Sequence, residues 1–325
     1  MTVEVSKLST TPTFTTTEAS ELLEQLRVNV ESVFRGKPQV VRWTLASVLA
    51  RGHVLLEDVP GVGKTTLALA MARSLGLSFQ RIQFTSDLLP GDILGVSIYS
   101  AKTGEFQFLS GPIFHGLVLA DEINRTTPRT QSALLEAMSE GSVSVDNQTL
   151  PLPNPFLVIA TQNPLDNHGT YPLPESQLDR FMFRLSIGYP AHEIERAILL
   201  ERKGADPVHS LDTLLQEGDL LGLQKVVSTI TVDESIADYI LKVVAATREH
   251  PQVRVGISTR GALAVMRALR AIALIEGRDF AIPDDAREVL IPCLAHRLSL
   301  RSGNQDRGAA EAVMESIVAE IDAPR

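Results

Sequence analysis

The chain has 325 residues, which is room for one large domain and a smaller one. Its 44% hydrophobic and 21% charged residues are ordinary for a globular protein, and its formal net charge of −9 argues against a protein that coats nucleic acid. The sequence has no apolar run as long as a membrane span, no basic segment followed by an apolar stretch at its N-terminus, and one cysteine, Cys293. We therefore expect a cytoplasmic protein without disulfides or a membrane span.

The N-terminal part of the chain is predicted to be a flexible tail followed by two helices. Residues 1–17 are rich in Thr and Ser and show no periodicity, as in disordered segments. An amphipathic helix is expected at 18–34 and a second helix at 38–50. The apolar run at 54–56 then predicts a short strand that is buried on both faces.

The segment after this strand has the residues of a phosphate-binding loop. Gly61 and Gly63 permit close approach of the backbone to an anion, Lys64 supplies positive charge, and Thr65 offers a hydroxyl to Mg²⁺. Residues 65–75 are expected to form the helix that this motif requires, ended by Gly76. We predict that ATP and Mg²⁺ bind here, with a metal contact from Thr65 and nucleotide contacts from Pro60, Gly61, Val62, Gly63, Lys64, Thr65 and Thr66.

One position of this loop departs from the general pattern G-x-x-x-x-G-K-[ST], because Asp58 stands where that pattern has glycine. Asp tolerates unusual backbone angles better than most residues, so we expect the turn to form nevertheless. The alternative is a glycine-rich turn before an ordinary helix. The strand before the loop and the helix after it favour the nucleotide site.

A second motif supplies two carboxylates. The apolar run at 117–120 is followed by Asp121 and Glu122. We predict that Asp121 holds Mg²⁺, which prefers oxygen ligands, and that Glu122 orients and polarises the attacking water. Alone, such a run is equally typical of an ordinary strand end, but downstream of a phosphate loop it indicates nucleotide hydrolysis.

Further predicted strands alternate with helices along the first 190 residues. Strands are expected at 79–84, 117–120, 156–161 and 184–187, and a helix at 130–140. This alternation predicts an α/β fold with a doubly wound parallel sheet that binds its ligand at the carboxyl ends of the strands. Two β-hairpins are expected as insertions at 91–113 and 142–152, and the alternative is that they are decorative surface hairpins.

After residue 190 the pattern changes to helices alone. A capping box formed by Thr231 and Glu234 predicts a helix that runs to His250, and further helices are expected at 258–277 and after Pro283. We therefore predict three parts: a flexible tail at 1–17, an α/β nucleotide-binding domain at 18–190, and an α-helical lid domain at 191–325.

Five sequence blocks in this order resemble the MoxR branch of the AAA+ ATPases: residues 60–65, 120–125, 160–164, 173–181 and 258–260. The resemblance covers roughly residues 20–300, with Asp58 and Thr259 as departures from the expected pattern. It implies a doubly wound parallel-sheet AAA+ domain with inserted β-hairpins that meet a client, followed by a smaller all-α lid. It also implies ATP hydrolysis with Mg²⁺ in a homo-oligomeric, hexameric ring, and a client protein with a von Willebrand factor A domain.

The resemblance also implies roles for three further residues. Asn163 corresponds to the polar sensor that places the attacking water, and its alternative is a turn-forming Asn before Pro164. Arg180 corresponds to the arginine finger that acts on a neighbouring subunit's nucleotide, and its alternative is a structural Arg paired with Asp179. Arg260 corresponds to the second sensor arginine in a lid helix, and its alternative is a surface Arg.

The leading hypothesis is an ATP-driven remodelling chaperone that matures or activates a partner protein. A related possibility is the ATPase subunit of a metal-chelatase complex, which no sequence feature favours. A nucleic-acid motor or transcription activator is disfavoured by the acidic composition and the lack of a DNA-binding motif. The departure at Asp58 leaves room for a nucleotide-gated binding module with little turnover.

Overall fold

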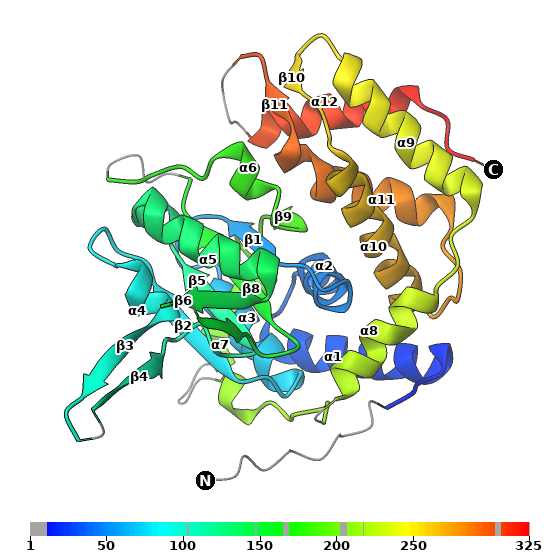
Figure 1. Ribbon diagram of the computed structural model, residues 1–325. Helices are drawn as coiled ribbons and strands as arrows, with labels where there is room; N and C mark the ends of the chain where they lie inside the picture. Colours follow the sequence, from blue (N-terminus) through cyan, green and yellow to red (C-terminus); the bar gives the residue numbers. More distant parts are fainter. Residues whose placement is uncertain are drawn as a thin grey trace.

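A five-stranded parallel sheet lies at the centre of the protein (Figure 1). The computed structural model describes residues 12–102, 104–146, 148–164, 169–201, 207–216, 218–302 and 307–324. The strand order is β2-β5-β8-β1-β9, and every neighbouring pair is parallel. The strands are β1 (Val54–Glu57), β2 (Phe79–Gln83), β5 (Leu117–Asp121), β8 (Leu157–Gln162) and β9 (Phe183–Leu185).

The sheet is covered by helices on both faces, because side chains of its buried strands alternate between two apolar clusters. Leu55 of β1 packs in a cluster with Leu134 and Leu135 of helix α5, on one face. Val54 and Leu56 pack on the other face, with residues of α2 and α3. The predicted doubly wound α/β architecture is therefore confirmed.

The helices surround this sheet and extend beyond it. Those of the first 190 residues are α1 (Thr16–Val33), α2 (Pro38–Leu49), α3 (Lys64–Ser74), α4 (Pro90–Leu94), α5 (Pro128–Glu140) and α6 (Glu175–Leu178). Those of the C-terminal part are α7 (His192–Glu201), α8 (Asp219–Thr229), α9 (Glu234–Glu249), α10 (Thr259–Ile275), α11 (Pro283–Leu294) and α12 (Arg307–Glu320). Short 3₁₀ helices are η1 (Ile123–Arg125), η2 (Pro207–Ser210) and η3 (Ala295–Arg297).

Both predicted hairpins are present. Strand β3 (Gly95–Ser100) pairs with β4 (Glu105–Ser110), and β6 (Ser142–Val145) pairs with β7 (Gln148–Pro151), each antiparallel. The β3–β4 hairpin projects away from the sheet (Figure 1). Its position makes it a prominent exposed feature of the α/β part.

Three local predictions need correction. Helix α1 begins at Thr16, inside the expected tail, because Thr15 and Glu18 form a capping box. The predicted capping box of Thr231 and Glu234 is wrong: Asp233 caps α9, and Thr231 instead bridges to Phe280. The C-terminal part also contains a short antiparallel pair, β10 (Val253–Val255) with β11 (Ser299–Leu300), besides its helices.

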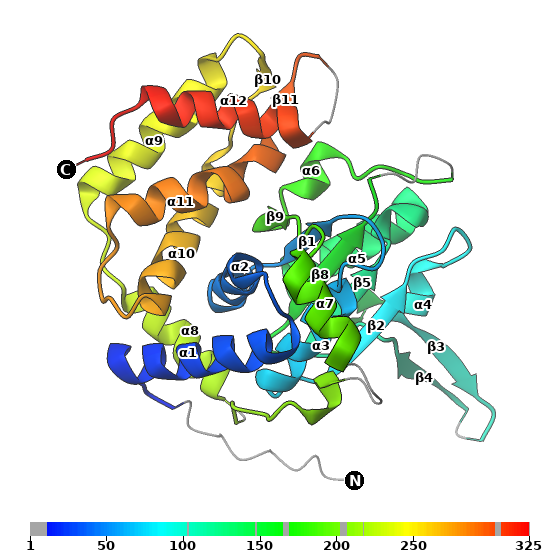
Figure 2. The same cartoon turned by 180° about the vertical axis from the view of Figure 1, so that it is seen from behind.

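The C-terminal helices pack against the N-terminal ones around a continuous apolar core. Helix α10 contacts α1, α2, α8 and α11, and Figure 2 shows α1 and α8 side by side below it. Buried residues from both ends of the chain share the same core cluster. Cys293 is buried and free. Among the described residues, no helix is both long and apolar enough to cross a membrane.

Candidate functional site

The phosphate loop connects the carboxyl end of β1 to the N-terminus of α3. Gly61 and Gly63 have φ angles of 86° and 95°, in the left-handed region that glycine adopts without strain. Gly63 is also the N-cap residue of α3, so the loop leads directly into the helix. A Cβ at Gly61 would meet no protein atom within 4 Å, so the loop faces open space there. Pro60 and Val62 lie in the loop, while Thr65 and Thr66 lie in the first turn of α3.

Lys64 is held by its own loop. Its Nζ donates to the carbonyl oxygens of Asp58, at 2.5 Å, and Val59, at 3.3 Å. Burial lowers the pKa of Lys64, against the opposing effect of the carboxylates of Asp58, Asp121 and Glu122. Lys64 thus adds a cation to the N-terminus of α3, a location that already favours an anion such as a phosphate group.

Asp58 does not use the unusual backbone angles that we expected of it. Its φ is not in the left-handed region, which in this loop is occupied by Gly61 and Gly63. Its side chain is instead buried and hydrogen-bonded to the segment after β9. The expected strand at 184–187 accordingly stops at Leu185, because the amides of Ile187 and Gly188 donate to Asp58.

Asp121 is the last residue of β5, and both of its carboxylate oxygens have partners. Thr161 donates its hydroxyl to Oδ1 at 2.5 Å. Arg81 of the neighbouring strand β2 donates to Oδ2, from Nε at 3.0 Å and from Nη2 at 2.6 Å. Arg81 was not identified from the sequence, since nothing in a lone Arg on a strand indicates that it faces the carboxylate at the end of a neighbouring strand.

Glu122 follows β5 with φ 59° and ψ 47°, which is uncommon for a residue other than glycine. Its amide donates to the hydroxyl of Thr161 at 2.9 Å. Its carboxylate accepts a hydrogen bond of 2.7 Å from Gln83 and lies 3.4 Å from the Nε of Arg125. Strained backbone held by surrounding contacts is typical of functional sites.

Asn163 completes the set at this edge of the sheet. It follows β8, which lies between β1 and β5, and it is buried. Residue Glu57 of β1 is in register with Gln162 of β8, so Asn163 emerges beside the start of the phosphate loop. The fold therefore brings together the phosphate loop, Asp121, Glu122 and Asn163 at the carboxyl ends of three adjacent strands.

Arg180 and Arg260 lie together, but at the other end of the strands, beyond the amino ends of β1 and β9. They line a cavity of about 140 Å³ with residues that immediately precede β1 and β9. In Figures 1 and 2, α6 beside β9 and α3 after the phosphate loop lie on opposite sides of β1. The cavity is lined by Arg51, Gly52, His53, Met138, Ser139, Asp179, Arg180, Met182, Arg260, Ala264, Arg267 and Arg297.

Five arginines and one aspartate make this cavity strongly positive. Asp179 is held by Arg297, whose side chain is 4% exposed and also donates to the carbonyl of Phe181. Arg260 is 3.8 Å from the other oxygen of Asp179. Arg180 instead donates to the carbonyl of Leu135 and the hydroxyl of Ser139. The pairing with Asp179 that the alternative interpretation of Arg180 as a structural arginine assumed is therefore not formed; the bonds of Arg180 go to α5 of its own chain.

His53, which lines this cavity, is expected to make the folded state less stable in acid. Burial, and to a smaller extent Arg267, lower its pKa from 6.5 to about 4, against a hydrogen bond to the carbonyl of Met138. The unfolded chain therefore binds more protons than the folded chain between pH 6.5 and 4, and stability falls as the pH is lowered through that window. Urea unfolding of the wild type should show this loss, and His53→Gln, which keeps a donor and an acceptor, should reduce it. Equal losses in both proteins would contradict this role of His53.

The donors at the phosphate-loop edge fit a nucleoside triphosphate with Mg²⁺. The described residues contain no cluster of three His, Cys, Asp or Glu side chains that would hold a metal by themselves. Mg²⁺ in nucleotide sites takes only one or two protein ligands beside phosphate and water oxygens. The Thr65 hydroxyl and the Asp121 carboxylate are oxygen donors of the kind that could hold Mg²⁺ in this way, and the Asp121 carboxylate is paired with the cation of Arg81 in this structure.

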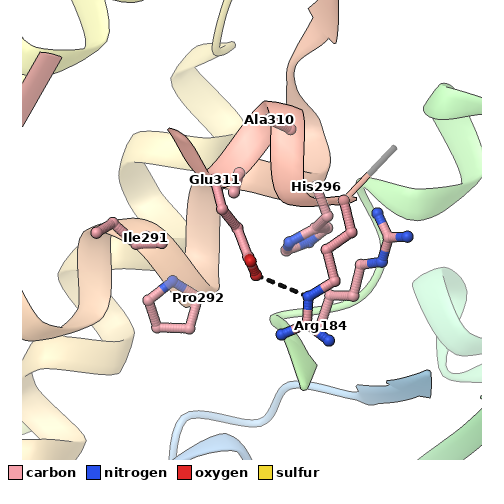
Figure 3. Close-up of a pocket in the computed structure, with 8 residues that line it drawn as sticks. Arg184, Ile291, Pro292, His296, Ala310 and Glu311 are labelled. Carbon is pink, nitrogen blue, oxygen red and sulfur yellow. Dashed lines mark hydrogen bonds and ion pairs between the residues drawn. The ribbon is translucent and has the colours of Figure 1, made fainter. Parts of the chain in front are cut away.

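A second enclosed space, behind β9, is not a ligand site. It lies between Arg184, His296 and α12 (Figure 3), and its volume of about 10 Å³ has room for one water at most. Arg184 contributes instead to a buried ion pair with Glu57 of β1, with Nε donating at 2.8 Å. Burial holds the pKa of His296 well below its usual value, so this residue is neutral.

Comparisons with known proteins show what the chain as a whole is similar to. The family model described as "ATPase family associated with various cellular activities (AAA)" matches residues 53–183, and the "AAA lid domain" model matches residues 245–317. The chain is 49% identical over 304 residues to the uncharacterized protein YeaC of Bacillus subtilis, covering 93% of this chain and 95% of that protein. It is 42% identical over 313 residues to Chaperone MoxR1 of Mycobacterium tuberculosis, covering 93% and 82%.

A solved structure and a more distant relative complete the comparison. A "putative ATPase" from Cytophaga hutchinsonii matches with a TM-score of 0.85 and 34% identity, over 95% of this chain and 97% of that one. Magnesium-chelatase subunit ChlI of Glycine max is 24% identical over 288 residues, covering 86% of this chain and 64% of that protein. The chelatase subunit is therefore a more distant relative of this chain than Chaperone MoxR1 is.

Proposed function

The chain belongs to the MoxR family of AAA+ ATPases, and from this premise we propose that it hydrolyses ATP with Mg²⁺ at a site shared between two copies of itself. The observation that carries this proposal is the separation of the phosphate loop from Arg180 and Arg260. The phosphate loop lies at the carboxyl ends of the strands, and the two arginines lie beyond their amino ends. A measurement of ATP turnover, with Glu122→Gln as the blank, tests the activity itself.

Within one copy, the residues at the phosphate-loop edge have complementary tasks. Residues 60–66 hold the triphosphate through the backbone, the positive charge of Lys64 and the first turn of α3. Thr65 and Asp121 hold the Mg²⁺, which offsets the charge of the phosphate oxygens when it is bound. Glu122 and Asn163 orient the attacking water, and Glu122 accepts its proton.

The two arginines belong to the site of a neighbouring copy. Between the cavity and the phosphate loop lies the whole of β1, whose four residues span about 13 Å, followed by the loop itself. An arginine side chain cannot cover that distance, so neither Arg180 nor Arg260 reaches the phosphates of its own chain. Since they line one cavity, both would face the same nucleotide. This head-to-tail geometry closes into a ring when the rotation permits, and we propose a hexamer.

We further propose that hydrolysis remodels a client protein in the cytoplasm. The β3–β4 hairpin supports this, because its apolar side chains are exposed far from the core: Phe106 is 73% exposed and stacks edge-on with Tyr99 at 5.4 Å between ring centroids. Exposed apolar patches of this kind mark sites of protein–protein contact. We propose a client with a von Willebrand factor A domain, as the family resemblance implies.

Polar substitution on this hairpin should uncouple client binding from hydrolysis. Phe106→Ser combined with Leu109→Ser is expected to leave basal ATP turnover within about twofold, because exposed surface positions contribute little to stability. The same variant should bind a purified von Willebrand factor A domain partner at least tenfold more weakly, since it lacks the apolar contact area (about 1.4 kcal/mol or more). Leu241→Ser on α9 is the matched control, since Leu241 is exposed to nearly the same extent as Leu109. Unchanged partner affinity of the hairpin variant would contradict this assignment.

A further inference from the structure

The Asp58 carboxylate joins two segments that are distant in the sequence. Its Oδ2 accepts three hydrogen bonds, from the hydroxyl of Ser186 at 2.8 Å and from the amides of Ile187 at 2.8 Å and Gly188 at 2.6 Å. Its Oδ1 accepts a fourth, from the amide of Val59 at 2.9 Å. Asp58 is only 8% exposed, so these donors are matched to a buried charge.

The hydrogen bonds determine the protonation state of this carboxyl group. Burial alone raises the pKa of Asp58, but the bonds from Gly188, Ser186, Val59 and Ile187 together outweigh it and lower the pKa. Asp58 is therefore an anion at neutral pH. A glycine at this position would leave three backbone amides and a hydroxyl without this acceptor, and the amide of Ile187 is buried. Buried donors without partners are costly.

Each end of this contact leads to a different part of the molecule. On one side, the Asp58 backbone carbonyl accepts from Lys64, and the amide of Asp58 donates to Gln162 of β8 at 3.2 Å. On the other side, Gly188 is followed by Tyr189, whose carbonyl accepts from Lys37 at 2.8 Å, and then by α7. The carboxylate is thus the direct connection between the phosphate loop and the segment that leaves the sheet for the C-terminal helices.

We propose that Asp58 is a positioning residue that fixes the start of the phosphate loop against residues 186–188, so that nucleotide binding at the loop and the position of that segment depend on each other. The inference rests on the proposed function, in that the ligand of the loop is a nucleotide. This role explains why Asp58 stands where the general loop pattern has glycine, because glycine has no side chain to accept these hydrogen bonds.

The test compares Asp58→Gly and Asp58→Asn with the wild type. Asp58→Gly restores the general pattern and should weaken binding of a fluorescent ATP analogue with Mg²⁺ by about tenfold or more, because four hydrogen bonds to a charged acceptor are lost. In Asp58→Asn one amide oxygen can still serve the three donors at 186–188, so the loss should be smaller. Asp285→Asn is the matched control, since Asp285 is also buried and accepts from Arg278 and Ile282.

Amide hydrogen exchange of the nucleotide-free protein tests the contact without any ligand. Asp58→Gly should speed exchange at 186–189 and at 58–64 together, while Asp285→Asn should leave both segments unchanged. If both segments of Asp58→Gly exchange as slowly as in the wild type, the inference is overturned, whether or not the protein binds ATP. The inference is also overturned if Asp58→Gly binds the ATP analogue as tightly as the wild type or Asp285→Asn does. Lack of binding by the wild type would instead contradict the proposed function, and exchange would still decide the role of Asp58.

Discussion

Replacement of Glu122 by Gln is expected to lower ATP turnover by about 10²–10⁴-fold while ATP still binds, because it removes the carboxylate that we propose takes the proton of the attacking water. The geometry around the side chain should persist. A Gln oxygen can accept the hydrogen bond from Gln83, and the amide of residue 122 keeps its bond to Thr161. The effect should therefore appear in kcat, with little change in the dissociation constant of ATP.

Binding and turnover have to be measured on the same preparation. A fluorescent ATP analogue reports the dissociation constant, and phosphate release reports the turnover. Glu140→Gln, an exposed carboxylate at the end of α5, is the matched control and should behave as the wild type. Full turnover by a Glu122→Gln protein that binds ATP would show that the water is activated elsewhere.

Replacement of Arg180 by Ala should be comparably severe, with a loss on the order of 10³–10⁵ if it acts as an arginine finger. The planar guanidinium pairs with phosphate oxygens through two parallel bonds, so Arg180→Lys should recover only part of the activity. Folding should change little, because Arg180 is partly exposed and its bonds go to Leu135 and Ser139 at the end of α5. Arg287→Ala, another exposed arginine, is the control.

A mixture of two inactive variants tests whether Arg180 acts on another copy. Lys64→Ala removes nucleotide binding but keeps the arginine, and Arg180→Ala keeps the phosphate loop but removes the arginine. In an equal mixture, roughly one head-to-tail interface in four joins an intact loop to an intact arginine, so activity should reappear. A mixture as inactive as its components would place Arg180 outside the neighbouring site.

The arrangement of the phosphate loop, Asp121 and Glu122 at the carboxyl ends of the strands was largely predictable from the sequence because its parts are local. The phosphate loop, the strand before it and the helix after it lie within residues 54–74, and Asp121 and Glu122 directly follow their own apolar strand. Short apolar runs separated by helices were sufficient to predict the parallel sheet. The β10–β11 pair was missed because its strands have only three and two residues.

Contacts between distant segments could not be predicted in this way. The partners of Asp58 lie about 130 residues further along the chain, and no local pattern at Ser186 or Gly188 indicates them. Similarly, the cavity gathers arginines from four separate segments, which become neighbours only when β1 and β9 run parallel. The separation of Arg180 from its own phosphate loop follows from that topology and from nothing visible in the motifs.

The most direct test of a shared site is ATP turnover per subunit across a wide range of protein concentration, with Glu122→Gln as the blank. If a neighbouring copy supplies Arg180 and Arg260, specific activity rises with concentration as copies associate and then reaches a plateau. A measurable activity that stays constant down to concentrations at which the protein is a monomer would contradict the account, because one chain would then complete the site alone.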